Sequence, residues 1–81
     1  MLYILLHKNE MGTFIEMVTK SGAKAIKELI RLYNEVLQKT PDDKISGFDM
    51  SNDKTFYAEI IYSGDETEWW EIVTYNEDKI Q

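Results

Sequence analysis

The 81-residue chain contains no cysteine, one proline and a single histidine, His7. Without cysteine it can form no disulfide, no thiolate nucleophile and no Cys-ligated zinc or iron site, and it fits a reducing compartment. No serine elbow or carboxylate stands at a characteristic spacing from His7, so no catalytic triad is indicated. We expect His7 at the surface or rim of the domain.

Glycines and acidic pairs are also too few or too scattered to form a known site. The four glycines make no phosphate-binding loop. The pairs Asp42-Asp43 and Asp49…Asp53 do not match the twelve-residue calcium loop with its ordered oxygen ligands. We therefore expect no metal, no cofactor and no enzymatic activity.

No long hydrophobic run is present either. The apolar start, Met1–Leu6, is too short to span a membrane and lacks the basic start and small-residue cleavage site of a signal peptide. We expect one cytoplasmic domain over residues 1–81, in the host cytoplasm if a phage encodes it, and no membrane contact.

The charge is unevenly distributed within a net charge of −6. Residues 1–41 hold six Lys or Arg against four Glu, whereas residues 42–81 hold three Lys against eleven Asp or Glu. The acidic half would repel phosphates, so we expect no direct binding of nucleic acid. Binding to a protein that itself holds nucleic acid remains compatible. The alternative is that the acidic surface only keeps a small protein soluble.

Hydrophobic periodicity predicts two strands and then a helix. A continuous apolar run at residues 2–7 is typical of a strand covered on both faces, and residues 13–19 form its hairpin partner across a turn. Over residues 22–39 the apolar positions recur every three or four residues, which indicates an amphipathic helix. Ser21 is a suitable N-cap, and Pro41 prevents continuation.

Three further strands are predicted at residues 45–50, 55–62 and 68–75, joined by turn-rich segments at 51–54 and 63–67. The order ββαβββ predicts an α+β, two-layer sandwich: a mostly antiparallel sheet with one amphipathic helix on one face. Whether the first strand pairs at the edge or in the middle of the sheet is left open.

Two adjacent tryptophans in the last predicted strand must point to opposite faces. Trp70 shares a face with apolar neighbours, so we expect it beneath the helix. Trp69 shares a face with glutamates, which are rarely buried. The second face should therefore carry aromatic and acidic side chains together, because one helix cannot cover both faces of the sheet.

Such a face resembles a protein interface, since aromatic residues dominate binding hot spots. Two alternatives stay open. In the first, the aromatic and acidic residues form cross-strand pairs that only stabilise an exposed sheet. In the second, the N-terminal hairpin folds across the face and buries it. A basic stripe on the helix is a further candidate contact surface, although a solvated face is its usual role. The stripe consists of Lys20, Lys24, Lys27 and Arg31.

Five short stretches also carry a resemblance to a known family. They are Ile15-Glu16-Met17-Val18, Pro41-Asp42-Asp43, Phe48-Asp49-Met50-Ser51-Asn52-Asp53, Trp70-Glu71-Ile72-Val73 and Glu77-Asp78-Lys79-Ile80. In these stretches, and in its order of strand, helix and acidic meander, the chain resembles the phage uracil-DNA glycosylase inhibitors, small acidic proteins that mimic DNA. The resemblance implies that Glu16, on an edge strand, meets the DNA groove of an enzyme. It also implies an apolar pocket for an enzyme loop on the helix-facing side of the sheet. The chain departs from that family in opening with a strand rather than a helix, and in its basic stripe.

From these observations we expect a small acidic, non-enzymatic binding protein of phage or mobile-element type. It would inhibit a nucleic-acid-processing or defence enzyme, as a DNA mimic or an anti-CRISPR-like protein. The alternative is a homodimeric interaction module, or an immunity or antitoxin-type protein, that uses the same face. The expected partner-binding residues are Trp69, Tyr57, Glu59, Glu71, Tyr75, Ile61, Glu16 and Asp49.

Overall fold

The structure, a computed structural model, describes residues 1–51, 56–64 and 66–76, without the side chains of residues 49–51. The predicted turn at residues 52–54, the predicted strand start at Thr55 and the C-terminal stretch 77–80 lie outside the described residues. Within the described part, no helix is both long and apolar enough to cross a membrane.

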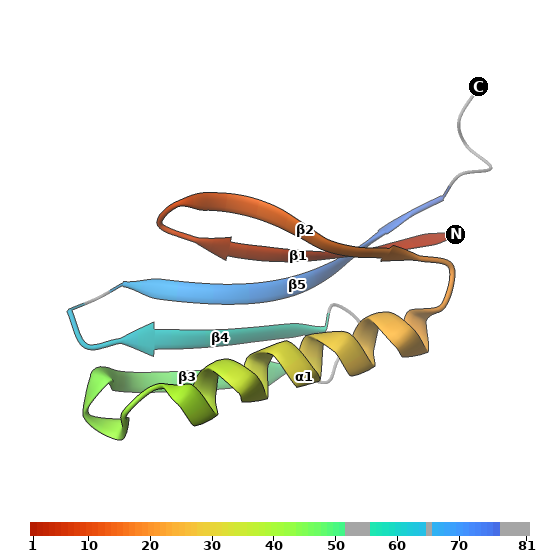
Figure 1. The fold of residues 1–81 in the computed structure, drawn as a ribbon. Coiled ribbons are helices and arrows are strands. Elements are labelled where there is room, and N and C mark those ends of the chain that lie inside the picture. Colours follow the sequence, from red (N-terminus) through yellow and green to blue (C-terminus); the bar gives the residue numbers. More distant parts are fainter. Residues whose placement is uncertain (52–55, 65, 77–81) are drawn as a thin grey trace.

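The predicted α+β fold is confirmed (Figure 1). Its elements follow one another in the predicted ββαβββ order, with one addition, a short 3₁₀ turn after the helix. The elements are β1 (Leu2–Asn9), β2 (Gly12–Thr19), α1 (Gly22–Lys39), η1 (Asp42–Lys44), β3 (Ile45–Ser51), β4 (Tyr57–Tyr62) and β5 (Thr67–Tyr75). The helix has the predicted bounds, and the strands differ from the prediction by one or two residues at their ends.

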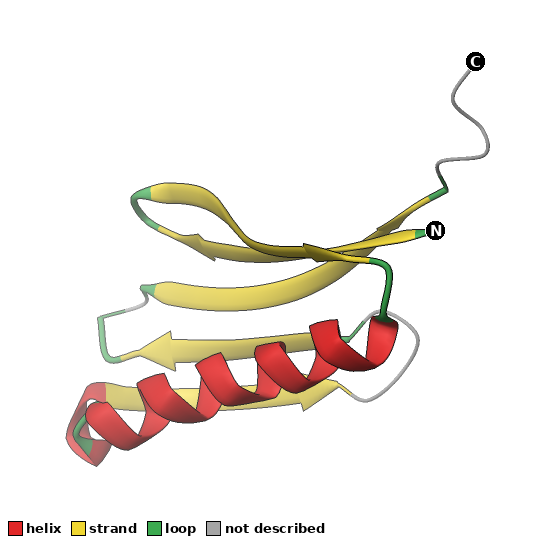
Figure 2. Ribbon diagram, turned by 45° about the vertical axis from the view of Figure 1, so that its right-hand side comes forward, coloured by secondary structure: helices red, strands yellow, loops and turns green. Residues whose placement is uncertain are grey.

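The strands form one antiparallel sheet in the order β2-β1-β5-β4-β3 (Figure 2). The first strand is therefore an inner strand, which pairs with its hairpin partner on one side and with the last strand on the other. The two edges of the sheet are β2 and β3. The predicted meander of the last three strands is present, and β1 extends it.

Local chemistry fixes both ends of the helix. The Ser21 side chain accepts a hydrogen bond from the backbone N–H of Lys24 at 3.2 Å, as an N-cap does. At the other end, Thr40 has extended angles (φ −99°, ψ 126°), as expected of a residue that precedes a proline. The apolar face of the helix packs on the sheet and forms one core. The core consists of Leu5, Ala25, Leu29, Tyr33, Ala58, Ile60, Trp70 and Ile72.

The helix covers only one face of the sheet (Figures 1 and 2). We call the opposite face the outer face; within the described residues, no element packs on it. The expectation that the first strand is covered on both faces is therefore wrong: Leu5 is buried under α1, whereas Ile4 and Leu6 on the outer face are only half-buried. The N-terminal hairpin does not fold across the outer face, because β1 and β2 continue the plane of the sheet beside β5.

Candidate interface on the outer face of the sheet

The register of the strands places the outer-face side chains in rows across the sheet. One row runs from Val18 through Ile4 to Val73. The next runs from Ile15 through Leu6 to Glu71, whose partner on β4 is Tyr57. A third joins Lys8, Trp69 and Glu59. Since directly paired residues share a face, the β2–β1–β5 half of the outer face is mainly apolar.

We call this half the apolar patch. Ile15 is 67% exposed, Val18, Val73 and Tyr75 are also exposed, and the β1 side chains between them are half-buried. Exposed aliphatic residues in contiguous rows differ from the single exposed leucines found on most surfaces. The patch consists of Leu2, Ile4, Leu6, Ile15, Val18, Val73 and Tyr75.

A β-bulge in the first hairpin builds this patch. Leu5 pairs with Met17, and the next residue, Leu6, pairs with Ile15, so Glu16 is an extra residue in β2. The bulge shifts the alternation of side chains by one position. As a result, Ile15 and Val18 lie on the same face although they are three residues apart. Alternation along an unbroken strand would have separated them, and so the sequence pattern did not reveal the patch.

The predicted aromatic and acidic residues occupy the other half of the outer face. Trp69 lies there, while Trp70 is 1% exposed beneath the helix, as predicted. Tyr57 pairs with Glu71, and Glu59 pairs with Trp69, so the strand register brings these four together. Tyr75 is exposed within the apolar patch, and Ile61 is half-buried next to them on β4. The backbone of Asp49 pairs with Glu59, but its side chain lies outside the described residues.

The glutamates of the outer face have partners within the protein. Lys8 Nζ lies 2.6 Å from Glu71 Oε1 and 5.8 Å from the centroid of the Trp69 ring. The Tyr57 hydroxyl donates to Glu59 Oε2 at 3.0 Å. Lys8 was not predicted as part of the face. Its position opposite Trp69 depends on the β1–β5 pairing, which local sequence patterns do not show.

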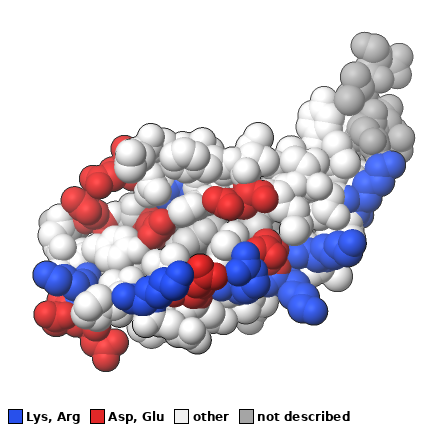
Figure 3. All heavy atoms as spheres, viewed as in Figure 1, with Lys and Arg blue, Asp and Glu red and all other residues white. Residues whose placement is uncertain are grey.

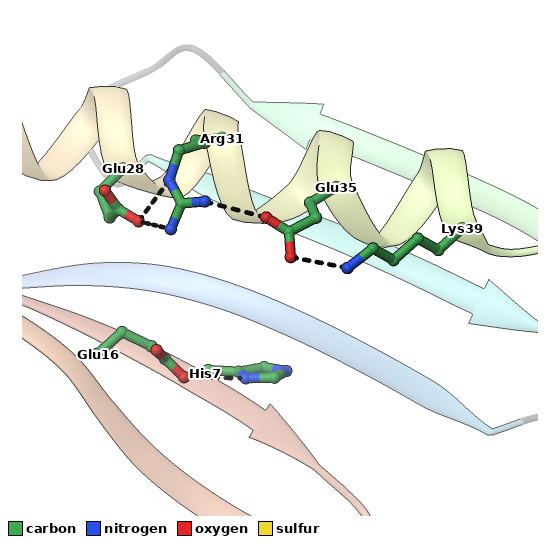
Figure 4. A network of polar contacts seen from close by, with 6 residues as sticks. All are labelled: His7, Glu16, Glu28, Arg31, Glu35 and Lys39. Carbon is green, nitrogen blue, oxygen red and sulfur yellow. Dashed lines mark hydrogen bonds and ion pairs between the residues drawn. The ribbon is translucent and has the colours of Figure 1, made fainter.

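Glu16, also a predicted binding residue, does not join this face. As expected, it lies on an edge strand, β2, but its carboxylate points to His7, with Glu16 Oε1 at 3.2 Å from His7 Nδ1 (Figure 4). His7 was expected at the surface or rim of the domain, and its side chain is partly buried, with 18% exposed. Its ring stacks on Trp70, and its Nε2 atom contacts Glu68 Oε2.

Tyr62 extends this polar network by donating a hydrogen bond to Glu68. Burial, followed by that hydrogen bond, raises the pKa of Tyr62 above its ordinary value. The two glutamates approach His7 from opposite ring nitrogens, so they cannot share one metal ion with it. Across the part of the chain that the structure describes, no three His, Asp or Glu side chains are placed to hold a metal.

The predicted basic stripe on the helix is partly neutralised. Arg31 donates to both Glu28 and Glu35, and Lys39 Nζ lies 3.1 Å from Glu35 (Figure 4). These are exposed pairs, one helical turn apart, of the kind that stabilises a helix surface only weakly because solvent screens the charges. Figure 3 shows Lys and Arg side chains along the helix with carboxylates among them.

Carboxylates gather instead at the end of the sheet where the β1–β2 and β4–β5 turns lie (Figure 3). A pocket there includes Glu10, Glu66 and Glu68 in its lining, along with Met11 and Tyr62. The Ser63 hydroxyl donates to the Asp43 carbonyl at 3.1 Å, which ties the acidic turn η1 to the same end. We call this region the acidic end.

Comparison with protein-family models, with curated proteins and with solved structures finds no match for this chain. Its function is therefore argued from the outer face and the acidic end.

Proposed function

We propose that the chain is a non-enzymatic binding protein whose interface is the outer face of the sheet. The observation that carries this proposal is the apolar patch: seven apolar side chains in adjacent rows, on a face that no described element covers. A sheet normally buries one hydrophobic face against a second layer. Among the described residues the helix supplies that layer on one face only, and we infer that a partner covers the other face.

The arrangement of side chains on this face is typical of an interface rather than of an ordinary solvent-exposed surface. Trp69 and Tyr57 lie beside the patch, and aromatic residues of this kind supply most of the energy at protein interfaces. The two glutamates are held by Lys8 and by Tyr57. A partner would therefore meet an apolar centre bordered by charges that already have partners.

The test is a capture experiment with three purified baits: the wild-type chain, Ile15→Lys and Phe48→Lys. Ile15 and Phe48 are 67% and 68% exposed and both lie on edge strands, but Phe48 pairs with the buried Ile60 and therefore lies on the helix side. We expect a bound protein, which includes a second copy of the chain, on wild type and Phe48→Lys and its loss on Ile15→Lys. Equal retention by all three baits, or no retention by any, would refute an outer-face interface.

As a second candidate, we propose that the protein inhibits a nucleic-acid-processing enzyme in the cytoplasm, as expected from the sequence, but through the acidic end rather than through the glutamates of the sheet face. The supporting observation is that Glu10 and Glu66 lie together in the pocket at the turns, whereas Glu71 and Glu59 on the outer face are held by Lys8 and Tyr57. Carboxylates can replace phosphates in a basic groove and speed association.

If the acidic end is the interface, the captured protein should respond differently to salt and to substitutions. Its retention should fall steeply with salt, because exposed charges are screened. It should also be lost on Glu10→Lys/Glu66→Lys and kept on Ile15→Lys. A salt-resistant complex that needs Ile15 would exclude the acidic end as its interface.

A further inference from the structure

The ring of His7 lies between two carboxylates on the helix side of the sheet. It stacks on Trp70, its partner on β5, with ring centroids 4.8 Å apart. Its Nδ1 atom lies 3.2 Å from Glu16 Oε1 on the edge strand β2 (Figure 4), and its Nε2 atom contacts Glu68 Oε2 on β5. One side chain of β1 thus connects the edge strand with an inner strand of the sheet.

Contact with both carboxylates at once requires a doubly protonated ring. A neutral imidazole has one N–H and one lone pair, whereas the imidazolium donates from both nitrogens. An ionised carboxylate only accepts hydrogen bonds, so a neutral ring can donate to Glu16 or to Glu68 but not to both. The face of the Trp70 indole also attracts a cation. The arrangement is therefore that of a ring with two protons.

The titratable groups around this ring come from every element packed near it. Within the described chain, its nitrogens contact no charged group other than Glu16 and Glu68. Burial raises the pKa of Tyr62, so its hydroxyl keeps its proton where histidine titrates. The remaining groups are Lys8 of β1, which pairs with Glu71 on the outer face, Tyr33 of α1, which meets Trp70 edge-on, Glu28, Arg31 and Glu35 of α1, which pair with one another (Figure 4), and Glu10 and Glu66 in the pocket at the acidic end.

Loss of one proton from the ring breaks the contact with Glu16 rather than the contact with Glu68. A ring with a single N–H keeps the carboxylate that is costlier to leave without a donor. That carboxylate is Glu68, which is 15% exposed, whereas Glu16 is 33% exposed and can turn to water. Glu16 is also the extra residue of the β2 bulge, and a bulge leaves its extra residue out of the hydrogen-bonded ladder. Its contact with His7 therefore ties the bulge to β1.

We propose that His7 and Glu16 form a proton-dependent latch on the edge strand β2. The doubly protonated ring holds the Glu16 carboxylate and with it the bulge, and loss of one proton releases both. The latch is closed below the pH at which the ring titrates and open above it. Ile15 and Val18 of the apolar patch lie on either side of the bulge, so an open latch loosens the edge of that patch. The latch is a property of the fold and does not depend on a partner at the outer face.

The experiment is nitrogen-15 NMR relaxation of the purified chain and of two variants. The ring signals of His7 give the pH at which it titrates, and the backbone order parameters of residues 15–17 are measured about one pH unit below and above that pH. Glu16→Gln makes the contact independent of the proton, because an amide can both donate to the ring and accept from it. Glu10→Gln is the control, since it removes the same charge from the turn of the same hairpin.

We expect the wild-type order parameters of residues 15–17 to fall from about 0.85 to about 0.6 as the ring loses its proton. Glu10→Gln should show the same fall, and Glu16→Gln should show none. Constant values in wild type overturn the latch, as does a fall that persists in Glu16→Gln or disappears in Glu10→Gln. A fall across all five strands also overturns it, because it reports unfolding of the whole sheet. None of these readouts involves a partner, so they are independent of the capture experiment.

Discussion

The imidazole ring of His7 stacks on the indole ring of Trp70, with centroids 4.8 Å apart and planes 12° apart. The two residues are directly paired across β1 and β5, the first and last strands of the chain. Trp70 also meets the Tyr33 ring of the helix edge-on at 6.0 Å. Trp70 thus joins the helix, the last strand and the first strand, and His7 covers one face of its indole with a polar ring.

The network around His7 predicts unequal roles for its two glutamates. Glu68 is 15% exposed and has two partners, His7 and Tyr62, whereas Glu16 is 33% exposed and, among the described residues, contacts His7. We expect Glu68→Gln to lower the free energy of unfolding by about 1–3 kcal/mol and Glu16→Gln by less than about 1 kcal/mol. Urea denaturation at neutral pH measures both, and equal losses would contradict the network.

Replacing each of the adjacent tryptophans with alanine should lower the free energy of unfolding by very different amounts. Trp70→Ala leaves a large cavity under the helix, and we expect a loss of about 3–5 kcal/mol. For a domain of this size, that is most of the stability. Trp69 is half-buried on the outer face, so Trp69→Ala should cost less than about 2 kcal/mol. Urea denaturation followed by far-ultraviolet circular dichroism at low protein concentration measures both. A larger loss for Trp69→Ala would mean that the assignment of faces is wrong.

The raised pKa of Tyr62 predicts that the folded state loses stability at alkaline pH. Burial and the hydrogen bond to Glu68 raise its pKa in the folded chain, so the folded state holds the phenol proton more tightly than the unfolded state does. Its contribution is complete below the ordinary tyrosine pKa of about 10 and declines as the pH rises above that value. The stability difference between wild type and Tyr62→Phe should therefore shrink from about pH 9 to pH 11. The comparison cancels the titration of the other tyrosines, and a constant difference would contradict the pKa shift.

The sequence predicted most of the fold because each element carried its own signal. Ser21 and Pro41 bounded the helix, and the separate faces of Trp69 and Trp70 followed from strand alternation alone. The position of the first strand had no such signal. A continuous apolar run fits a strand with two covered faces, but it fits equally an inner strand with one face open. Only the pairing of β1 with β5 decides between them.

The candidate interface was predicted in part, for the same reason. Residues of β4 and β5 were placed on the outer face correctly, because those strands alternate without interruption. The apolar patch depends on the bulge at Glu16, and no residue pattern in the sequence predicts that bulge. Its neutrality depends on the contact of Lys8 with Glu71, residues 63 positions apart in the sequence. Contacts between distant strands cannot be read from local periodicity.

Salt should separate the two proposed uses of the protein. A complex held by the apolar patch should keep its dissociation constant in rising sodium chloride and become tighter in sulfate, which strengthens apolar association. Lys8→Gln should change this behaviour. It leaves Glu71 without its partner on the outer face, so that an unpaired carboxylate borders the apolar patch and repels other carboxylates brought close to it. We expect this variant to dissociate at low salt and to recover partly at high salt, as screening reduces the repulsion. Sedimentation equilibrium at low and high sodium chloride measures both chains. If wild type weakens with salt, charge rather than the apolar patch holds the complex.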